Sequence, residues 1–251
     1  MGKTLVIGLG EIGQPLANLL ARSHDVVGKD IEPLELHEPV EVMHICYPYE
    51  IGDFVGTTVE YIRQYRPSLV IINSTVVPGT SRKIQEQVEV PIVYSPIKGK
   101  HWKMEDDLLY YPKFVAGFDE EAAVRAGTHF LRVGMKVRLF QPVEGLELAK
   151  LIETTYFGLL IAWAQEVERL AKQVKADYYD VMSFTEGIPY LPPQVFTPGY
   201  IGGHCVIPNI HLLLTRFQSK FFDAILDSNY RKALELGMEE ALKQQKTPEE
   251  G

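Results

Sequence analysis

Cysteine is scarce in this sequence, and long apolar runs are absent. Two cysteines, Cys46 and Cys205, are too few for the disulfide framework of a small secreted domain. No stretch reaches the roughly 18 consecutive apolar residues of a membrane-spanning helix. Residues 1–10 lead directly into an apolar strand, without the longer apolar region and cleavage site of a signal peptide. We therefore expect a cytoplasmic protein with reduced thiols and no membrane contact.

Basic residues are also fewer than acidic ones. The 25 Lys and Arg residues stand against 33 Asp and Glu residues, which gives a formal net charge of −8. Because no cluster of Lys and Arg stands out, nucleic acid is not expected as a partner. The chain has 251 residues, of which 46% are hydrophobic, so one large domain or two small ones can bury a core.

The first thirty residues have the pattern of a strand, a turn, a helix and a second strand. Residues 4–7 form the continuous apolar run of a buried parallel strand, and Gly8, Gly10 and Gly13 follow as G-x-G-x-x-G. In this context the glycines predict a dinucleotide site, since they allow a tight turn, backbone approach to a pyrophosphate and close helix packing. The start of the following helix would then donate amide hydrogens to the phosphates.

Asp30 ends the second of these strands. A carboxylate at this position binds the ribose hydroxyls and repels a 2′-phosphate, so we predict NAD as the cofactor in preference to NADP. Lys29 is the neighbouring charge that works against this preference.

Strands and helices continue to alternate up to residue 140. Strands are predicted at 42–47, 69–74, 91–95, 113–117 and 136–140, and helices at 53–65 and 80–88. This alternation predicts an α/β fold with a Rossmann-type, doubly wound, mostly parallel sheet. The interval between Asp30 and the strand at 42–47 is too short for another helix and strand, so we expect the sheet to be trimmed there.

The second half of the chain is helical in pattern. Residues 144–174 carry apolar side chains at helical spacing on more than one face, which predicts one long helix buried between partners. We therefore expect a homodimer through this helix. The predicted domains are an NAD-binding Rossmann domain at 1–142 and a helical dimerisation and substrate domain at 143–251. A further helix is predicted at 220–244, and KTPEEG at the C-terminus is predicted to be a loose tail.

One glycine-rich stretch, TPGYIGGHCVIPN at 197–209, ends its turn on Cys205. Glycines let the backbone approach a ligand, and His204 beside the thiol can help to hold a thiolate. This favours a nucleophile presented to a ligand, and the alternative is a tight turn that contains an ordinary cysteine.

The long helix contains a second candidate. Lys150 and Thr154 are one turn apart and project from one face. The alternative to catalysis is a solvated lysine that pairs with Glu147 or Glu153.

Three stretches of the sequence occur together in one order: GLGEIGQPLA at 8–17, NSTVVPGT at 73–80, and ELAKLIETTY at 147–156 with AQEVERLAKQVKAD and GYIGGHCVIPN after it. Together they resemble the UDP-glucose/GDP-mannose dehydrogenase family, the nucleotide-sugar 6-dehydrogenases. The GGHC form is similar to the N-acetylhexosamine-uronate branch of that family.

The resemblance implies a two-step oxidation of a sugar CH2OH to a carboxylate with two NAD. Cys205 would add to the intermediate aldehyde, and the resulting thiohemiacetal would be oxidised to a thioester that water hydrolyses. Lys150 would stabilise the oxyanion, and Thr75 would lie near the nicotinamide and a bound water. The loop 199–204 would hold the sugar through its backbone.

The candidate site residues form three groups. Those predicted to be catalytic are Cys205, Lys150, Thr75, Thr154 and Asn209. Those predicted to bind the cofactor are Gly8, Gly10, Glu11, Ile12, Gly13, Asp30, Tyr47, Pro48, Ser74 and Thr75. Those predicted to form the substrate loop are Gly199, Tyr200, Gly202, Gly203 and His204. No metal site is predicted, and His44 and Cys46, on a strand with expected alternating exposure, are interpreted as core or adenosine-pocket residues.

The chain departs from the family pattern at several positions. Thr154 stands where the family has asparagine, Asn209 stands where it has aspartate, and SPIKGKH at 95–101 lacks the two glutamates of the family's P-E-F-x-x-E-G. These changes predict that hydrolysis of the thioester is slow or absent. The sequence also ends without the family's further C-terminal Rossmann-like domain, which would weaken the grip on a nucleotide sugar.

Two other functions remain open on the sequence. A single-step alcohol dehydrogenase resembling the β-hydroxyacid dehydrogenases would combine the same two kinds of domain with a helix lysine and would need no cysteine. A non-catalytic NAD-binding protein would depend on a partner subunit for the missing domain. The glycine loop around Cys205 favours the sugar dehydrogenase, whereas Asn209 favours the non-catalytic alternative.

Overall fold

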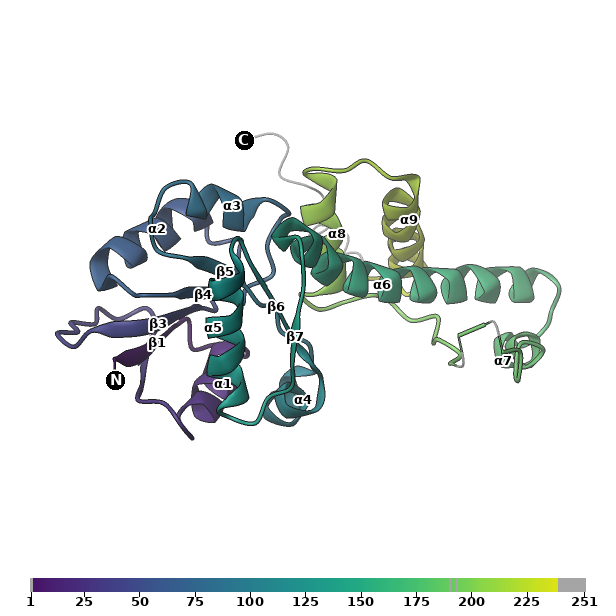
Figure 1. Ribbon diagram of the computed structural model, residues 1–251. Helices are drawn as coiled ribbons and strands as arrows, with labels where there is room; N and C mark the ends of the chain where they lie inside the picture. Colours follow the sequence, from purple (N-terminus) through teal and green to yellow (C-terminus); the bar gives the residue numbers. More distant parts are fainter. Residues whose placement is uncertain (1, 190, 193, 239–251) are drawn as a thin grey trace. The chain divides into compact units, whose positions relative to one another are not determined.

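The computed structural model describes residues 2–189, 191–192 and 194–238. The chain forms two compact units, Met1–Lys150 and Leu151–Gly251 (Figure 1). The predicted domain boundary after residue 142 stands at the start of α6 (Val143–Gln173), and the division into compact units falls within that helix, after Lys150.

The first unit contains a seven-stranded sheet in the order β2-β1-β3-β4-β5-β6-β7. The strands are β1 (Lys3–Ile7), β2 (Val26–Lys29), β3 (Val40–Ile45), β4 (Val70–Ile72), β5 (Ile92–Tyr94), β6 (Lys113–Gly117) and β7 (Val137–Leu139). Only the pairing of β5 with β6 is antiparallel among the described strands. The predicted Rossmann-type, mostly parallel sheet is therefore confirmed.

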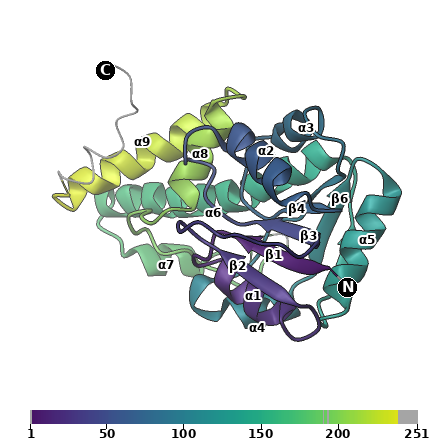
Figure 2. The ribbon, with the colours of Figure 1, turned by 90° about the vertical axis from the view of Figure 1, so that its left-hand side faces the viewer.

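Helices cover both faces of this sheet (Figure 2). They are α1 (Gly13–Leu20), α2 (Phe54–Tyr65), α3 (Thr80–Gln85), the 3-10 turn η1 (His101–Lys103), α4 (Met104–Tyr110) and α5 (Glu120–Leu131). Val6 and Ile71 pack with α1, α4 and α5, whereas Leu5 and Ile72, their chain neighbours, pack with α2 and α3. Because the strands are buried on both faces, they are apolar throughout, which is the signal that the sequence offered.

The sheet is trimmed beside β2, as expected. β2 is the edge strand, and the chain passes from it to β3 through a segment without a helix or strand. The hydroxyl of Tyr65, at the end of α2, donates to the carbonyl of Leu34 at 2.9 Å and fastens this segment to the unit.

The second unit is helical and includes the larger part of α6, as predicted. Its other helices are α7 (Tyr178–Ser183), α8 (Val206–Leu214) and α9 (Lys220–Glu235). A Cβ at Gly158 would stand 2.6 Å from Cγ1 of Val206, so the glycine allows α8 to approach α6 closely. Ile201, Ile210 and Ile225 join this contact in a small core.

The predicted helix at 220–244 is wrong at residues 236–238, because α9 ends at Glu235. Residues 239–244 and the predicted tail at 246–251 lie outside the described residues. Within the part of the chain that the structure describes, no helix has the length and apolar character needed to cross a membrane.

Candidate functional site

The predicted cofactor residues lie at one edge of the sheet. Beyond the ends of β1, β3 and β4 the hydrogen bonding continues, with Cys46 N donating to Ile7 O and Asn73 N donating to Ile45 O, both at 2.8 Å. The loops that begin at Gly8, Cys46 and Asn73 are therefore neighbours. In open α/β sheets, ligands bind at the carboxyl ends of the strands, where these loops lie.

The three glycines of the first loop have different surroundings. Gly8 has φ +90°, and a Cβ there would stand 2.7 Å from the nitrogen of Tyr47. A Cβ at Gly13 would lie 1.7 Å from the carbonyl oxygen of Gly8, so any side chain would separate α1 from the loop. At Gly10 no atom of the described residues, apart from the glycine and its two chain neighbours, lies within 4 Å of the Cβ position. The fold itself thus requires the first and third glycines, whereas the second faces open space that fits an approaching phosphate.

Asp30 and Lys29 lie at the end of β2 in different environments. Asp30 is exposed, whereas Lys29 is 6% exposed. The Lys29 ammonium donates to the carbonyls of Asp30 and Glu32 and lies 5.5 Å from the centroid of the Tyr61 ring. Because its hydrogen bonds go to the backbone of the turn, Lys29 competes less with Asp30 than their adjacency in sequence suggested.

The second and third loops are joined by buried hydroxyls. Ser74 Oγ donates to the carbonyl of Tyr47 at 2.6 Å, and the hydroxyls of Tyr47 and Thr58 are hydrogen-bonded at 2.6 Å. Burial raises the pKa of the Tyr47 phenol. Ser74 and Tyr47 therefore hold the loops together, whereas Pro48 is exposed and Thr75 is half-buried.

A buried chain of polar side chains lies behind these loops, and the sequence did not predict it. The Nε2 atoms of His44 and His129 are 3.0 Å apart, and Asn73 Nδ2 lies 3.1 Å from Nδ1 of His44. Lys113 Nζ donates to Asn73 Oδ1 at 3.2 Å and to the carbonyls of Ser95 and Pro96. Only the position of Lys113, a charge at the start of an apolar strand, could have signalled this chain.

Burial controls the protonation of these groups. It lowers the pKa of Lys113 to about 7 and that of His129 to about 3. His44 and Cys46 are core residues, as predicted, but the expected alternating exposure is wrong because β3 is buried on both faces.

Glu147, at the start of α6, caps another helix. Its carboxylate accepts from the backbone nitrogen of Gly79 at 2.5 Å and from that of Ser81 at 2.9 Å. Burial raises the pKa of this carboxyl group. The sequence had suggested Glu147 only as an ion-pair partner of Lys150, which lies one turn further along α6 and is half-buried.

In the second unit, Cys205 is the N-cap residue of α8 and is half-exposed. Asn209, one turn into α8, donates from Nδ2 to Oγ1 of Thr154 at 2.9 Å. Thr154 in turn donates to the carbonyl of Leu151 at 3.0 Å. The structure thus pairs two of the predicted catalytic residues, Thr154 and Asn209, through neutral groups.

The glycine loop that leads to Cys205 is held by side chains that the sequence analysis missed. Gln165 of α6 donates to the carbonyl of Gly199 at 2.6 Å, and Asn229 of α9 binds the backbone of Ile201. Both amide side chains are fully buried. No local pattern in the sequence indicated these contacts, because they join residues far apart in the chain.

Sequence comparison identifies related proteins. Residues 144–232 match the model of the UDP-glucose/GDP-mannose dehydrogenase family, central domain. The UDP-N-acetyl-D-mannosamine dehydrogenase of Pyrococcus horikoshii is 27% identical over an alignment that covers 86% of this chain and 65% of that protein. The chain thus spans less than two thirds of the length of this relative.

Solved structures share the fold. The structure of the UDP-D-ManNAc dehydrogenase from Pyrococcus horikoshii superposes with a TM-score of 0.81 at 23% identity, covering 96% of this chain and 72% of that one. The 3-hydroxyisobutyrate dehydrogenase of Mycobacterium tuberculosis has a TM-score of 0.68 at 17% identity, covering 93% of this chain and 94% of that one. Residues 144–232 thus match the central domain of the UDP-glucose/GDP-mannose dehydrogenase family, and the chain is similar to a UDP-N-acetyl-D-mannosamine dehydrogenase over most of its length.

Proposed function

We propose that this chain is an NAD-dependent nucleotide-sugar dehydrogenase that oxidises a sugar CH2OH group toward the carboxylate through Cys205. The observation that carries the proposal is the position of Cys205, half-exposed at the N-terminal end of α8 after an anchored glycine loop. Backbone N–H groups at a helix N-terminus favour a thiolate. Cys46 provides the contrast, since burial raises the pKa of its thiol to about 12.

The predicted cofactor residues and the predicted substrate loop would hold different ligands. Gly8, Gly10 and Gly13, with Glu11, Ile12 and the start of α1, would hold the pyrophosphate of NAD. Asp30 would accept hydrogen bonds from the ribose hydroxyls, and Thr75 and Pro48 would contact the nicotinamide end. The backbone of the loop from Gly199 to His204 would hold the sugar. When bound, NAD would accept the hydride that each oxidation removes from the sugar carbon, and the hydroxyl proton lost in the first oxidation would pass to solvent.

The protein's own contribution to the second oxidation is covalent. The Cys205 thiolate adds to the aldehyde carbon, so that a carbon–sulfur bond forms and the carbonyl oxygen becomes an oxyanion. Lys150 supplies the positive charge that stabilises this oxyanion. After oxidation to the thioester, water would add to the carbonyl carbon, the carbon–sulfur bond would break, and the carboxylate and the Cys205 thiolate would separate while the two protons of the water pass to solvent.

The pair formed by Thr154 and Asn209 bears on this last step. A hydroxyl and an amide do not accept a proton from water near neutral pH, unlike the aspartate for which Asn209 stands. The pair can orient a water molecule, but it supplies no base. We therefore expect a burst of NADH followed by slow turnover.

Assembly as a homodimer through α6 is part of the proposal. Tyr156, Trp163 and Leu170 recur every seven residues on this helix and are 53%, 60% and 50% exposed. Such a stripe is typical of a helix that packs against another helix.

Mass measurement on the intact protein tests the chemistry. The protein is incubated with NAD and UDP-N-acetylhexosamines, and we expect an acyl adduct on Cys205 but not on Cys46. Cys205→Ser should stop the reaction at the aldehyde level, because a serine hydroxyl is a much weaker nucleophile at this pH. Absence of any adduct, together with full activity of Cys205→Ser, would refute the thioester mechanism.

A second function has one specific observation in its favour. The likeness to the 3-hydroxyisobutyrate dehydrogenase extends over 94% of that enzyme's chain, whereas the nucleotide-sugar dehydrogenase structure is covered over 72%. A single-step alcohol dehydrogenase would use Lys150 and need no thiol. NADH release on a small hydroxyacid, unchanged by Cys205→Ser, would establish it.

A further inference from the structure

We infer that Asn229 and Gln165 form an amide clamp that positions Cys205, because they fix the backbone of the glycine loop that leads to the thiol. Neither residue belongs to the catalytic set proposed above, and both act through the loop. The inference rests on the proposed role of Cys205 as the nucleophile. It identifies the side chains that determine where that nucleophile stands.

Asn229 binds both polar backbone groups of a single loop residue. Its Oδ1 accepts from the nitrogen of Ile201 at 2.7 Å, and its Nδ2 donates to the carbonyl of Ile201 at 3.1 Å. In a β-sheet, an adjacent strand forms the same pair of hydrogen bonds with the backbone N–H and C=O of one residue. Asn229 is 0% exposed and Ile201 is 3% exposed, so water does not compete for these bonds.

Gln165 holds the start of the loop. Its Nε2 donates to the carbonyl of Gly199 at 2.6 Å and lies 3.5 Å from Oδ1 of Asn229. Its Oε1 accepts from the hydroxyl of Ser228 at 2.8 Å. The segment from Gly199 to Ile201 is thereby fastened to α6 and to α9 at the same time.

The loop needs such anchors because of its composition. Gly199, Gly202 and Gly203 contribute no side chains, and glycine has the largest backbone freedom to lose on ordering. Residues 202–204 are exposed. The amide clamp fixes the chain just before this short exposed stretch, and α8 fixes it just after. The backbone position of Cys205 is therefore held from both sides.

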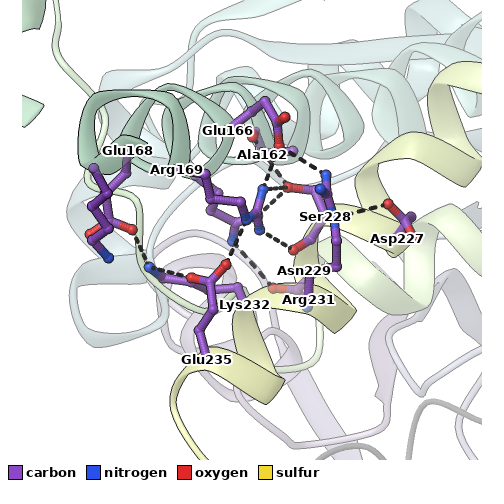
Figure 3. A network of polar contacts seen from close by, with 12 residues as sticks. Ala162, Glu166, Glu168, Arg169, Asp227, Ser228, Asn229, Arg231, Lys232 and Glu235 are labelled. Atoms are coloured by element: carbon purple, nitrogen blue, oxygen red, sulfur yellow. Dashed lines mark hydrogen bonds and ion pairs between the residues drawn. The ribbon is translucent and has the colours of Figure 1, made fainter. Parts of the chain in front are cut away.

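A charged network keeps the clamp in register (Figure 3). Arg169 of α6 donates to the carbonyl of Ser228 at 2.8 Å and pairs with Glu235 at 2.6 Å. Lys232 of α9 pairs with Glu168 of α6 at 2.5 Å. These bonds fix α9 along α6, so that the residue after Ser228 meets the loop. The groups that touch the loop are neutral amides, which do not titrate.

The experiment measures alkylation of Cys205 by iodoacetamide in the full-length protein between pH 6 and pH 10, with peptide-level mass spectrometry. Asn229→Ala frees the loop, so Cys205 shifts from the amides of α8 that favour its thiolate. We expect the Cys205 rate at pH 7 to fall about tenfold, with a smaller change at pH 10, where most thiols are ionised. Gln165→Met, which keeps the volume but removes the bond to Gly199, should give a smaller change in the same direction.

Ser228→Ala is the matched control. Ser228 is buried in the same network and bonds to Gln165, but no hydrogen bond joins its side chain to the glycine loop among the described contacts. It should lower the thermal midpoint, as Asn229→Ala does, and leave the pH profile of Cys205 unchanged. If Asn229→Ala does not fold, Asn229→Asp and Gln165→Met replace it, since both nearly keep the shape of the native side chain.

The outcomes separate the two proposals. If the clamp variants lower the thermal midpoint but give the wild-type profile at Cys205, Asn229 and Gln165 only stabilise the fold, and the inference is wrong. If wild-type Cys205 reacts no faster than Cys46, the proposed nucleophile itself is wrong, whatever the clamp variants do. A reactive wild-type Cys205 with a profile altered by the clamp variants and unaltered by Ser228→Ala supports both.

Discussion

The two units of the chain differ in how completely they bury their apolar side chains. In the first unit, helices cover both faces of the sheet, and the exposed large apolar residues, such as Trp102 and Leu131, are scattered over separate elements. In the second unit, Tyr156, Trp163 and Leu170 form a stripe along one helix. Scattered apolar residues are ordinary on a protein surface, whereas an aligned stripe calls for a partner. The proposed homodimer rests on this difference, because the aligned stripe lies in the second unit.

The largest effect should come from a charge in the α6 stripe. Trp163→Glu should halve the mass measured by light scattering to 28.4 kDa, because an unpaired carboxylate cannot be buried in an apolar interface. Trp102→Glu is the matched control, since Trp102 is 79% exposed and lies in the first unit. A wild-type mass of 28.4 kDa at micromolar concentration would show a monomer and contradict the proposed homodimer through α6.

Substitutions of two glycines of the first unit should have smaller effects, one on stability and the other on NADH binding. Gly13→Ala should cost about 3 kcal/mol of unfolding free energy or more, because its Cβ overlaps the Gly8 carbonyl and forces the backbone to move. Gly10→Val should leave the thermal midpoint nearly unchanged and abolish NADH binding, measured by fluorescence titration. Unchanged NADH affinity in Gly10→Val would mean that the glycine fingerprint is only a turn.

Lys113 should give the first unit a characteristic pH dependence. Its pKa is lowered to about 7 by burial, so between pH 7 and its unfolded value of 10.5 the unfolded chain holds a proton that the folded chain does not. The unfolding free energy should therefore rise with pH in this window, by up to about 1.4 kcal/mol per unit. Lys113→Met should remove this slope in denaturant titrations. A wild-type slope equal to that of the variant would show that Lys113 stays charged on its three oxygen acceptors.

The smallest effect concerns the choice of cofactor. Asp30→Ala should weaken NAD binding about tenfold, as expected for a hydrogen bond to a charged group, and should not weaken NADP binding. Calorimetric titration of both cofactors measures the two affinities. If wild-type protein binds NADP as tightly as NAD, Lys29 outweighs Asp30 despite its hydrogen bonds to the turn.

The sequence could predict features whose signal is local. The glycine spacing after an apolar run located the first strand, its loop and α1, and the apolar residues at helical spacing located α6. The sequence could not reveal that β6 runs antiparallel to β5, because KFVAG is equally apolar in either direction. It also extended the strand at 42–47 too far, since Cys46 and Tyr47 are buried although they follow the end of β3.

The missed residues act over long separations in the chain. Gln165 and Asn229 are 64 positions apart, and the side chains of Lys113 and Asn73 meet across 40. No periodicity in a short window indicates such a contact, because it depends on how helices and strands pack. The position of Cys205 could be guessed from its glycines, but the side chains that fix it could not.

The cap that Glu147 supplies to α3 has a consequence for synthesis on the ribosome. The backbone N–H groups of Gly79 and Ser81 donate to this carboxylate. Glu147 lies 66 to 68 residues later in the chain, so these hydrogen bonds cannot form until the start of α6 has been synthesised. Because domains fold in order as they emerge, the N-terminus of α3 in the nascent first unit stays uncapped until that point. An N-terminal fragment that ends at residue 142 would lack Glu147 and leave α3 uncapped, whereas a fragment that ends at Lys150 would contain the capping carboxylate.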